Sequence, residues 1–71
     1  MFGTRLNSVR KQKGFTALYM AEQLNMQIRS YRRYESGHCE PSLESLKKIA
    51  DILDVSVDFL LGRDDFIEKH K

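Results

Sequence analysis

The segment from Thr16 to Glu40, TALYMAEQLNMQIRSYRRYESGHCE, constrains the fold of this chain more than any other part. Its spacing predicts two short helices, roughly residues 17–24 and 28–35, joined by a turn of about two residues. A connection this short suits a steep crossing of the two helices. Thr16 is a good N-cap for the first helix. Asn25 lies in the turn and is the non-glycine residue that best tolerates a left-handed conformation.

The rest of the chain also predicts helices with short connections, and no strand pattern competes. An apolar stripe of Phe2, Leu6 and Val9 marks a first helix, which Lys13-Gly14 ends. Ser42 and Ser56 are good N-caps for two later helices. The expected core stripe of the fourth helix consists of Leu43, Leu46, Ile49, Ala50 and Leu53. We therefore expect an all-α fold, a compact five-helix bundle.

Length and composition limit the classes of protein that fit. Seventy-one residues form one small domain, and Cys39 is the only cysteine, so no intrachain disulfide can form. A single cysteine fits a reducing cytoplasm, and no apolar run is long enough for a membrane span. Residues 1–40 carry seven basic and three acidic side chains, whereas residues 41–71 carry five and seven. The basic half therefore contains the predicted helix pair, which favours a polyanionic partner.

Three arginines, Arg29, Arg32 and Arg33, lie on the second helix of this pair, largely on the face away from Tyr31 and Tyr34. Arginine can fork onto guanine or pair with a phosphate, and a short helix with one arginine face fits the major groove of DNA. The alternative is a charged face that is only solvated. The capped preceding helix, whose first amides can bind a phosphate, and the short turn favour DNA.

Several short motifs at fixed spacing are typical of one family. They are KGFT at 13–16, AE and Leu at 21–24, RYESG at 33–37, PSLESLKKIA at 41–50 and VSVDFLLG at 55–62. Together they resemble the Cro/C1-type helix-turn-helix regulators, also called the XRE family. The resemblance covers about residues 5–62. It implies a lambda-repressor-like DNA-binding domain at 1–62. The remaining residues, 63–71, are mostly charged, and we expect them to form a tail or the start of a linker.

The resemblance also implies roles for individual positions. The residues expected to face DNA are Thr16, Gln27, Ile28, Arg29, Arg32, Arg33, Ser36 and His38. Thr16 caps the second helix near a phosphate, and Ser36 and His38 lie in a loop that often touches the DNA backbone. Arg10 and Glu35 match an internal ion pair that ties the first helix to the end of the third.

The chain departs from the family pattern at several positions. Ala17 stands where relatives usually have a glutamine that holds a phosphate, and Glu40 lies in a loop that is often basic. Fewer phosphate contacts predict weaker affinity and a shallower salt dependence. Tyr31 replaces an apolar β-branched residue and either belongs to the core or exposes its hydroxyl. Ile28 either packs on a thymine methyl or belongs to a protein-binding surface.

The last predicted helix suggests self-association. Phe59, Leu60 and Leu61 are three consecutive large apolar residues that one small domain cannot bury completely. In the family that the chain resembles, this region commonly makes the two-fold dimer contact. A homodimer would place two recognition helices about one DNA turn apart, roughly 34–36 Å.

The sequence gives little support for a metal site, a catalytic site or a cofactor site. His38, Cys39 and His70 lack zinc-ligand spacing, so we expect no metal. No nucleophile has a base and an orienting partner, and no glycine-rich phosphate loop occurs, so we expect neither an enzyme nor a cofactor.

The leading hypothesis is a cytoplasmic, sequence-specific DNA-binding transcriptional regulator, a repressor that reads a palindromic operator in double-stranded DNA as a homodimer. One alternative is an antitoxin or a phage or mobile-element repressor, controlled by a protein partner such as a toxin or an antirepressor. The other is a protein-interaction module on the same scaffold, which Ile28, Tyr31 and Glu40 motivate.

Overall fold

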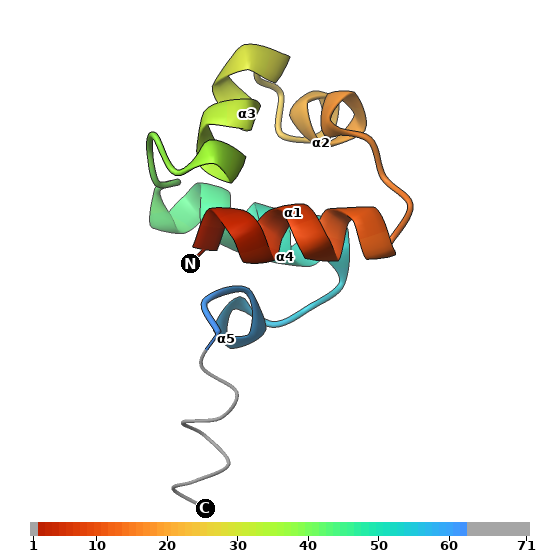
Figure 1. Cartoon of the computed structure of the whole chain (residues 1–71), viewed down its shortest axis with the longest axis vertical. Helices are drawn as coiled ribbons and strands as arrows, with labels where there is room; N and C mark the ends of the chain where they lie inside the picture. Colours follow the sequence, from red (N-terminus) through yellow and green to blue (C-terminus); the bar gives the residue numbers. More distant parts are fainter. Residues whose placement is uncertain (1, 63–71) are drawn as a thin grey trace, which may run out of the picture.

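The computed structural model describes residues 2–62, and within them the chain is an all-helical bundle without strands (Figure 1). The five helices are α1 (Phe2–Gln12), α2 (Ala17–Gln23), α3 (Ile28–Ser36), α4 (Leu43–Leu53) and α5 (Val57–Leu60). The predicted fold class is therefore confirmed. The charged segment predicted at 63–71 lies outside the described residues.

Helix α1 runs through the middle of the bundle in Figure 1, with α2 and α3 on one side and α5 on the other. Helix α3 packs against both α1 and α2, and α5 packs against α1 and α4. The helix pair made of α2 and α3 thus forms one end of the molecule, away from α5. No helix of residues 2–62 is long and apolar enough to cross a membrane.

The core lies where these helices meet. It contains residues from every helix: Leu6, Val9, Met20, Ala21, Tyr31, Leu46, Ile49, Ala50, Leu53 and Leu60. Ala21 is buried in α2, and α2 packs against α3. Tyr31 is fully buried, so its ring belongs to the core.

Side chains of the predicted type begin three of the helices. Thr16 Oγ1, Ser42 Oγ and Ser56 Oγ accept hydrogen bonds from the amides of the residues three positions later, at 3.0, 3.2 and 3.0 Å. Each bond satisfies an amide that the helix itself leaves without a partner. All three predicted caps are confirmed.

The left-handed conformation predicted at Asn25 is confirmed, and Gly37 also adopts one. Gly37 ends α3 with φ 84°, in the left-handed region that glycine adopts without strain. Asn25 adopts φ 56° between α2 and α3. That connection was expected to be about two residues long. It contains the four residues Leu24 to Gln27, because Leu24 forms the C-cap of α2 and Gln27 the N-cap of α3.

The prediction that Leu43 belongs to the core was wrong. Its side chain is 80% exposed, whereas the other four residues of the predicted α4 stripe are buried. Leu43 is the first residue of α4. It has the same helical phase as the stripe, but it lies at the end of the helix where no other element of residues 2–62 covers it.

Helix α1 approaches the end of α3 closely at Gly3. A Cβ atom at Gly3 would lie 2.6 Å from the carbonyl oxygen of Glu35 and 2.8 Å from that of Tyr34. Real Cβ atoms essentially never come so near to other heavy atoms. The absence of a side chain at Gly3 therefore sets how tightly α1 holds the C-terminal turn of α3.

Candidate nucleic-acid interface

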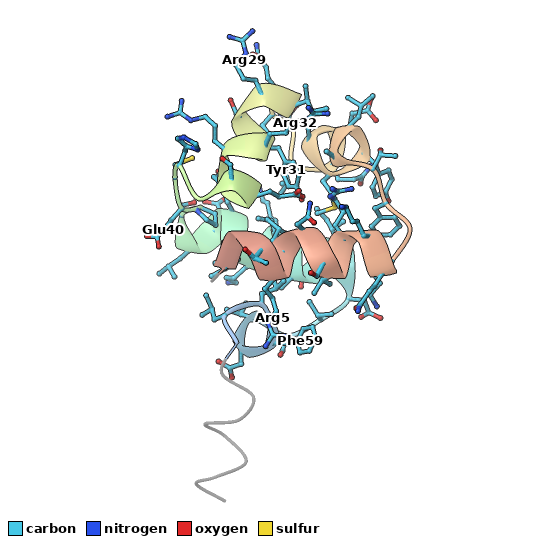
Figure 2. The ribbon with its side chains drawn as sticks, in the orientation of Figure 1. Arg5, Arg29, Tyr31, Arg32, Glu40 and Phe59 are labelled. Atoms are coloured by element: carbon cyan, nitrogen blue, oxygen red, sulfur yellow. The ribbon has the colours of Figure 1, made fainter. Side chains whose placement is uncertain are left out.

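Helix α3 presents its arginines to solvent and its aromatic face to the core. Arg29, Arg32 and Arg33 are all exposed, whereas Tyr31 is fully buried and Tyr34 is half-buried. In Figure 2, Arg29 points away from the bundle at the free end of α3, and Tyr31 lies on the inner side of the same helix. The three guanidinium groups therefore form one cationic surface on the outer side of α3.

The two residues at the start of α3 differ in exposure. Gln27 is exposed in an extended conformation and is the N-cap, although its side chain makes no capping hydrogen bond. Its amide group is therefore not committed to the helix. Ile28 is half-buried and packs against the core cluster. Only part of the Ile28 side chain is left for contact with another molecule.

The start of α2 is exposed beside an apolar surface. Thr16 is exposed, and its Oγ1 atom accepts the hydrogen bond from the amide of Tyr19. Leu18 is 52% exposed and Tyr19 is 38% exposed. The ring of Tyr19 packs on the ring of Phe15 with centroids 4.6 Å apart. An aliphatic and an aromatic side chain thus flank the threonine that was expected to face a phosphate.

The loop after α3 carries two further predicted residues. Ser36 and His38 are both exposed, and Ser36 Oγ lies 2.7 Å from His38 Nδ1. Ser36 Oγ also donates to the carbonyl oxygen of Arg33 at 3.3 Å. The imidazole is therefore held against the C-terminal turn of α3. Glu40 is exposed farther along the same loop, where it adds a negative charge.

Behind the exposed face, the Glu35 carboxylate accepts hydrogen bonds from side chains of two helices. Arg10 Nε donates to Oε2 at 2.7 Å, and Arg10 Nη2 donates to Oε1 at 3.3 Å. Asn7 Nδ2 donates to Oε1 at 2.7 Å, and the Tyr31 hydroxyl donates to Oε2. Arg10 Nη1 also donates to the carbonyl oxygen of Phe15 at 2.8 Å. We call Asn7, Arg10, Tyr31 and Glu35 the Glu35 cluster.

Hydrogen bonding controls the ionisation of this cluster. Burial alone raises the pKa of Glu35, but the hydrogen bonds from Arg10, Tyr31 and Asn7 outweigh it and lower that pKa below its ordinary value. Burial and the hydrogen bond to Glu35 raise the pKa of the Tyr31 phenol far above its usual range. The hydrogen bond to Glu35 raises the pKa of Arg10. At neutral pH the ionisable groups of the cluster are therefore a carboxylate, a guanidinium and a neutral phenol.

The structure thus pairs Arg10 with Glu35, and the two side chains are only 11% and 10% exposed. Sequence reasoning did not find Asn7, and it left the place of the Tyr31 hydroxyl open. Asn7 lies one turn from Arg10 on α1, and Tyr31 lies one turn from Glu35 on α3. That i to i+3 or i+4 spacing was the available signal.

The three residues predicted for a dimer contact have different environments. Leu60 is fully buried in the core, so it has no surface to offer a partner in this structure. Phe59 is half-buried, and the Arg5 guanidinium lies 4.9 Å from the centre of its ring. Leu61 is 46% exposed. Leu61 shares a hollow of about 270 Å³ with Phe2, Glu40, Pro41, Leu43 and Leu46.

A comparison with known protein families shows which family this chain belongs to. The sequence model of the helix-turn-helix family matches residues 6–60, which include all five helices except the first turn of α1. The chain belongs to the helix-turn-helix family, in its Cro/C1-type or XRE branch.

Named relatives agree with this family. Over 61 residues the chain is 46% identical to the SPbeta prophage-derived uncharacterized HTH-type transcriptional regulator YonR of Bacillus subtilis, covering 86% of this chain and 56% of YonR. Over 59 residues it is 44% identical to the cryptic phage CTXphi transcriptional repressor RstR of Vibrio cholerae, covering 83% of this chain and 53% of RstR. The chain therefore spans about half the length of these curated relatives.

A solved structure supports the same fold. The chain is similar to the biofilm master regulator SinR, which was crystallised in complex with DNA, with a TM-score of 0.78 and 34% identity. The similarity covers 86% of this chain and 98% of the SinR chain. The lambda-repressor-like architecture implied by the sequence motifs is thus confirmed.

Proposed function

We propose that this chain is the DNA-binding part of a sequence-specific transcriptional regulator, acting as a repressor in the cytoplasm. The observation that carries the proposal is the exposure of Arg29, Arg32 and Arg33 on the outer face of α3, while the inner face is packed into the core. A helix that is held in this way can enter a major groove without deforming. The guanidinium group of an arginine can then donate two hydrogen bonds, to O6 and N7 of a guanine.

The relatives support this proposal through their names. RstR is named as a phage transcriptional repressor, YonR as a prophage-derived regulator, and SinR was solved with DNA. We extend to this chain the transcriptional regulation named for YonR and RstR and the DNA complex named for SinR. The phage origin of two of them also favours a repressor of a phage or mobile element.

The proposed partners of the DNA backbone are few. We propose phosphate contacts from Thr16, Ser36 and His38, which are exposed at the start of α2 and after the end of α3. Ala17 has no polar side-chain atom for a phosphate, and the exposed Glu40 repels one. Log affinity falls by about 0.9 per unit of log salt concentration for each phosphate that a Lys or Arg neutralises, and the hydroxyls of Thr16 and Ser36 neutralise none. The salt dependence should therefore be shallow for a regulator of this type.

Dimerisation is a separate part of the proposal. Leu43 is 80% exposed and Leu61 is 46% exposed, and both line the hollow beside Phe2 and Pro41. We propose that a second copy covers this apolar surface and contacts the half-buried Phe59, while Leu60 supports the surface from the core. A two-fold pair would read a palindrome whose half-sites are about one helical turn apart.

One experiment tests these parts together. Duplexes that bind the protein are selected from a pool with a randomised region and then sequenced. We expect a palindromic consensus with half-sites about 10 base pairs apart, centre to centre. A consensus with a single half-site would contradict the dimer, and the absence of any consensus would contradict sequence-specific binding.

A second candidate is favoured by the start of α2. Leu18 and Tyr19 are exposed apolar side chains next to Thr16, at the edge where DNA would lie. A protein partner that covers them would also block that edge, as an antirepressor or a toxin paired with an antitoxin would. If the protein binds no duplex from the random pool even at low salt, a protein-interaction module becomes the better explanation.

A further inference from the structure

The Glu35 cluster connects the two elements that the proposed function places on DNA. Arg10 donates to Glu35 in the last turn of α3 at 2.7 Å and to the carbonyl of Phe15 at 2.8 Å. Phe15 directly precedes Thr16, the cap of α2. One guanidinium on α1 therefore holds both the start of α2 and the end of α3.

Two other residues of the Glu35 cluster also donate hydrogen bonds to the Glu35 carboxylate. Its carboxylate accepts four hydrogen bonds, of which Asn7 supplies one and the Tyr31 hydroxyl another. Tyr31 and Glu35 lie one turn apart on the inner face of α3. The three bonds from Asn7 and Arg10 come from α1, so they resist rotation of α3 about its axis. The bond from Tyr31, on α3 itself, fixes the plane in which the carboxylate meets those donors.

We propose that Tyr31 and Asn7 are positioning residues for the DNA-facing surface, which set the rotation of α3 through Glu35. The inference rests on the proposed function and goes beyond the Arg10–Glu35 ion pair. Phenylalanine at position 31 would fill the same core volume, so the ring alone does not require a hydroxyl. A buried hydroxyl is costly unless it has a partner, and Tyr31 has Glu35 as that partner.

Small rotations of α3 matter because its arginines lie on the outside. The side chains of a helix reach about 5–6 Å from its axis. A rotation of about 10° therefore moves a guanidinium by about 1 Å, whereas a recognition site must be held to about 0.5 Å. Base contacts are more sensitive to such a shift than phosphate contacts, since a hydrogen-bonded base edge fixes both distance and direction.

Tyr31→Phe in the full chain removes the hydroxyl and keeps the ring. Tyr34→Phe is the matched control, because it removes a hydroxyl from a half-buried tyrosine of the same helix. Affinities are measured for the selected duplex and for a scrambled duplex, at a temperature where circular dichroism shows every variant fully folded. The quantity that matters is the dissociation constant for the scrambled duplex divided by the dissociation constant for the selected duplex.

We expect Tyr31→Phe to reduce this ratio by roughly tenfold. That is about the effect of losing one hydrogen bond between an arginine of α3 and a base. Binding to the scrambled duplex and its salt slope should stay unchanged, because the same phosphates are contacted. Tyr34→Phe should keep the wild-type ratio. Asn7→Ala, which changes α1 instead of α3, should also lower the ratio and provides the test if Tyr31→Phe does not fold.

Two results would overturn the inference. A ratio within twofold of the wild type for folded Tyr31→Phe would mean that the hydroxyl does not position α3. An equal loss on both duplexes would mean that it supports general stability only. Failure of the proposed function has a different signature, since the wild-type protein would then not discriminate between the two duplexes.

Discussion

Replacing Gly3 by alanine tests the close packing of α1 against α3. The new Cβ atom would lie 2.6 Å from the Glu35 carbonyl oxygen, and ordinary contact begins at 3.4 Å. The two atoms must therefore separate by about 0.8 Å. The obstructing atoms belong to the backbone of α3 and not to a flexible side chain, so the helices themselves have to move apart.

Two effects of Gly3→Ala oppose each other. Alanine favours a helix over glycine by up to about 1 kcal/mol. Forcing an extra carbon into a packed contact costs about 1–3 kcal/mol. Because the clash involves two carbonyl groups of one rigid helix, we expect the steric cost to win. The net loss in the free energy of unfolding should be about 1–2 kcal/mol, a large part of the roughly 3–5 kcal/mol that a core of this size supplies.

Thermal unfolding followed by circular dichroism measures this loss. A destabilisation of 1 kcal/mol lowers Tm by roughly 4–8 °C in a domain of this size. Ser8→Ala is the control, because Ser8 is exposed in the same helix and its replacement gains helix propensity without a clash. A Gly3→Ala protein as stable as the wild type would refute the close approach of α1 to α3.

Two further predictions concern acid stability and the proposed dimer. The pKa of Glu35 is lowered in the folded state, so its stabilising contribution is present above its unfolded pKa of about 4.3 and is lost as pH falls through the folded pKa. The gap in Tm between the wild type and Glu35→Gln should therefore narrow as the pH is lowered below about 4, and a gap that does not change with pH would contradict this. Leu43→Ser removes an exposed apolar side chain, so it should leave Tm within a few degrees of the wild type while weakening self-association in sedimentation experiments. Unchanged self-association would mean that the dimer uses another surface.

Local rules were enough to predict the helices and their caps. The hydroxyls of Thr16, Ser42 and Ser56 bond to amides only three residues away, so sequence spacing contains all the information that they need. The same holds for the left-handed turn at Asn25.

Leu43 shows where helical periodicity was insufficient. Its phase agrees with the core stripe, but burial also depends on whether another element covers that end of α4. That covering depends on the whole bundle, which no local pattern describes.

Only part of the candidate site could be predicted from the sequence. The pairing of Arg10 with Glu35 was available through the family resemblance and is present in the structure. The i to i+4 spacing places the Tyr31 hydroxyl within reach of Glu35, but the sequence alone did not show that this face of α3 is buried. The DNA-facing roles of the arginines remain predictions, since exposure on α3 is necessary for them but does not identify a base.

The central claim is that the exposed arginines of α3 read bases, and Arg29→Ala tests it most directly. Affinities of the wild type and the variant are measured for the selected duplex and for a set of duplexes that each carry one base-pair change. We predict that Arg29→Ala loses about 1–3 kcal/mol on the selected duplex and becomes indifferent to the base pair at one position, while it keeps its preferences elsewhere. An equal loss on every duplex, or no loss at all, would contradict base recognition by Arg29.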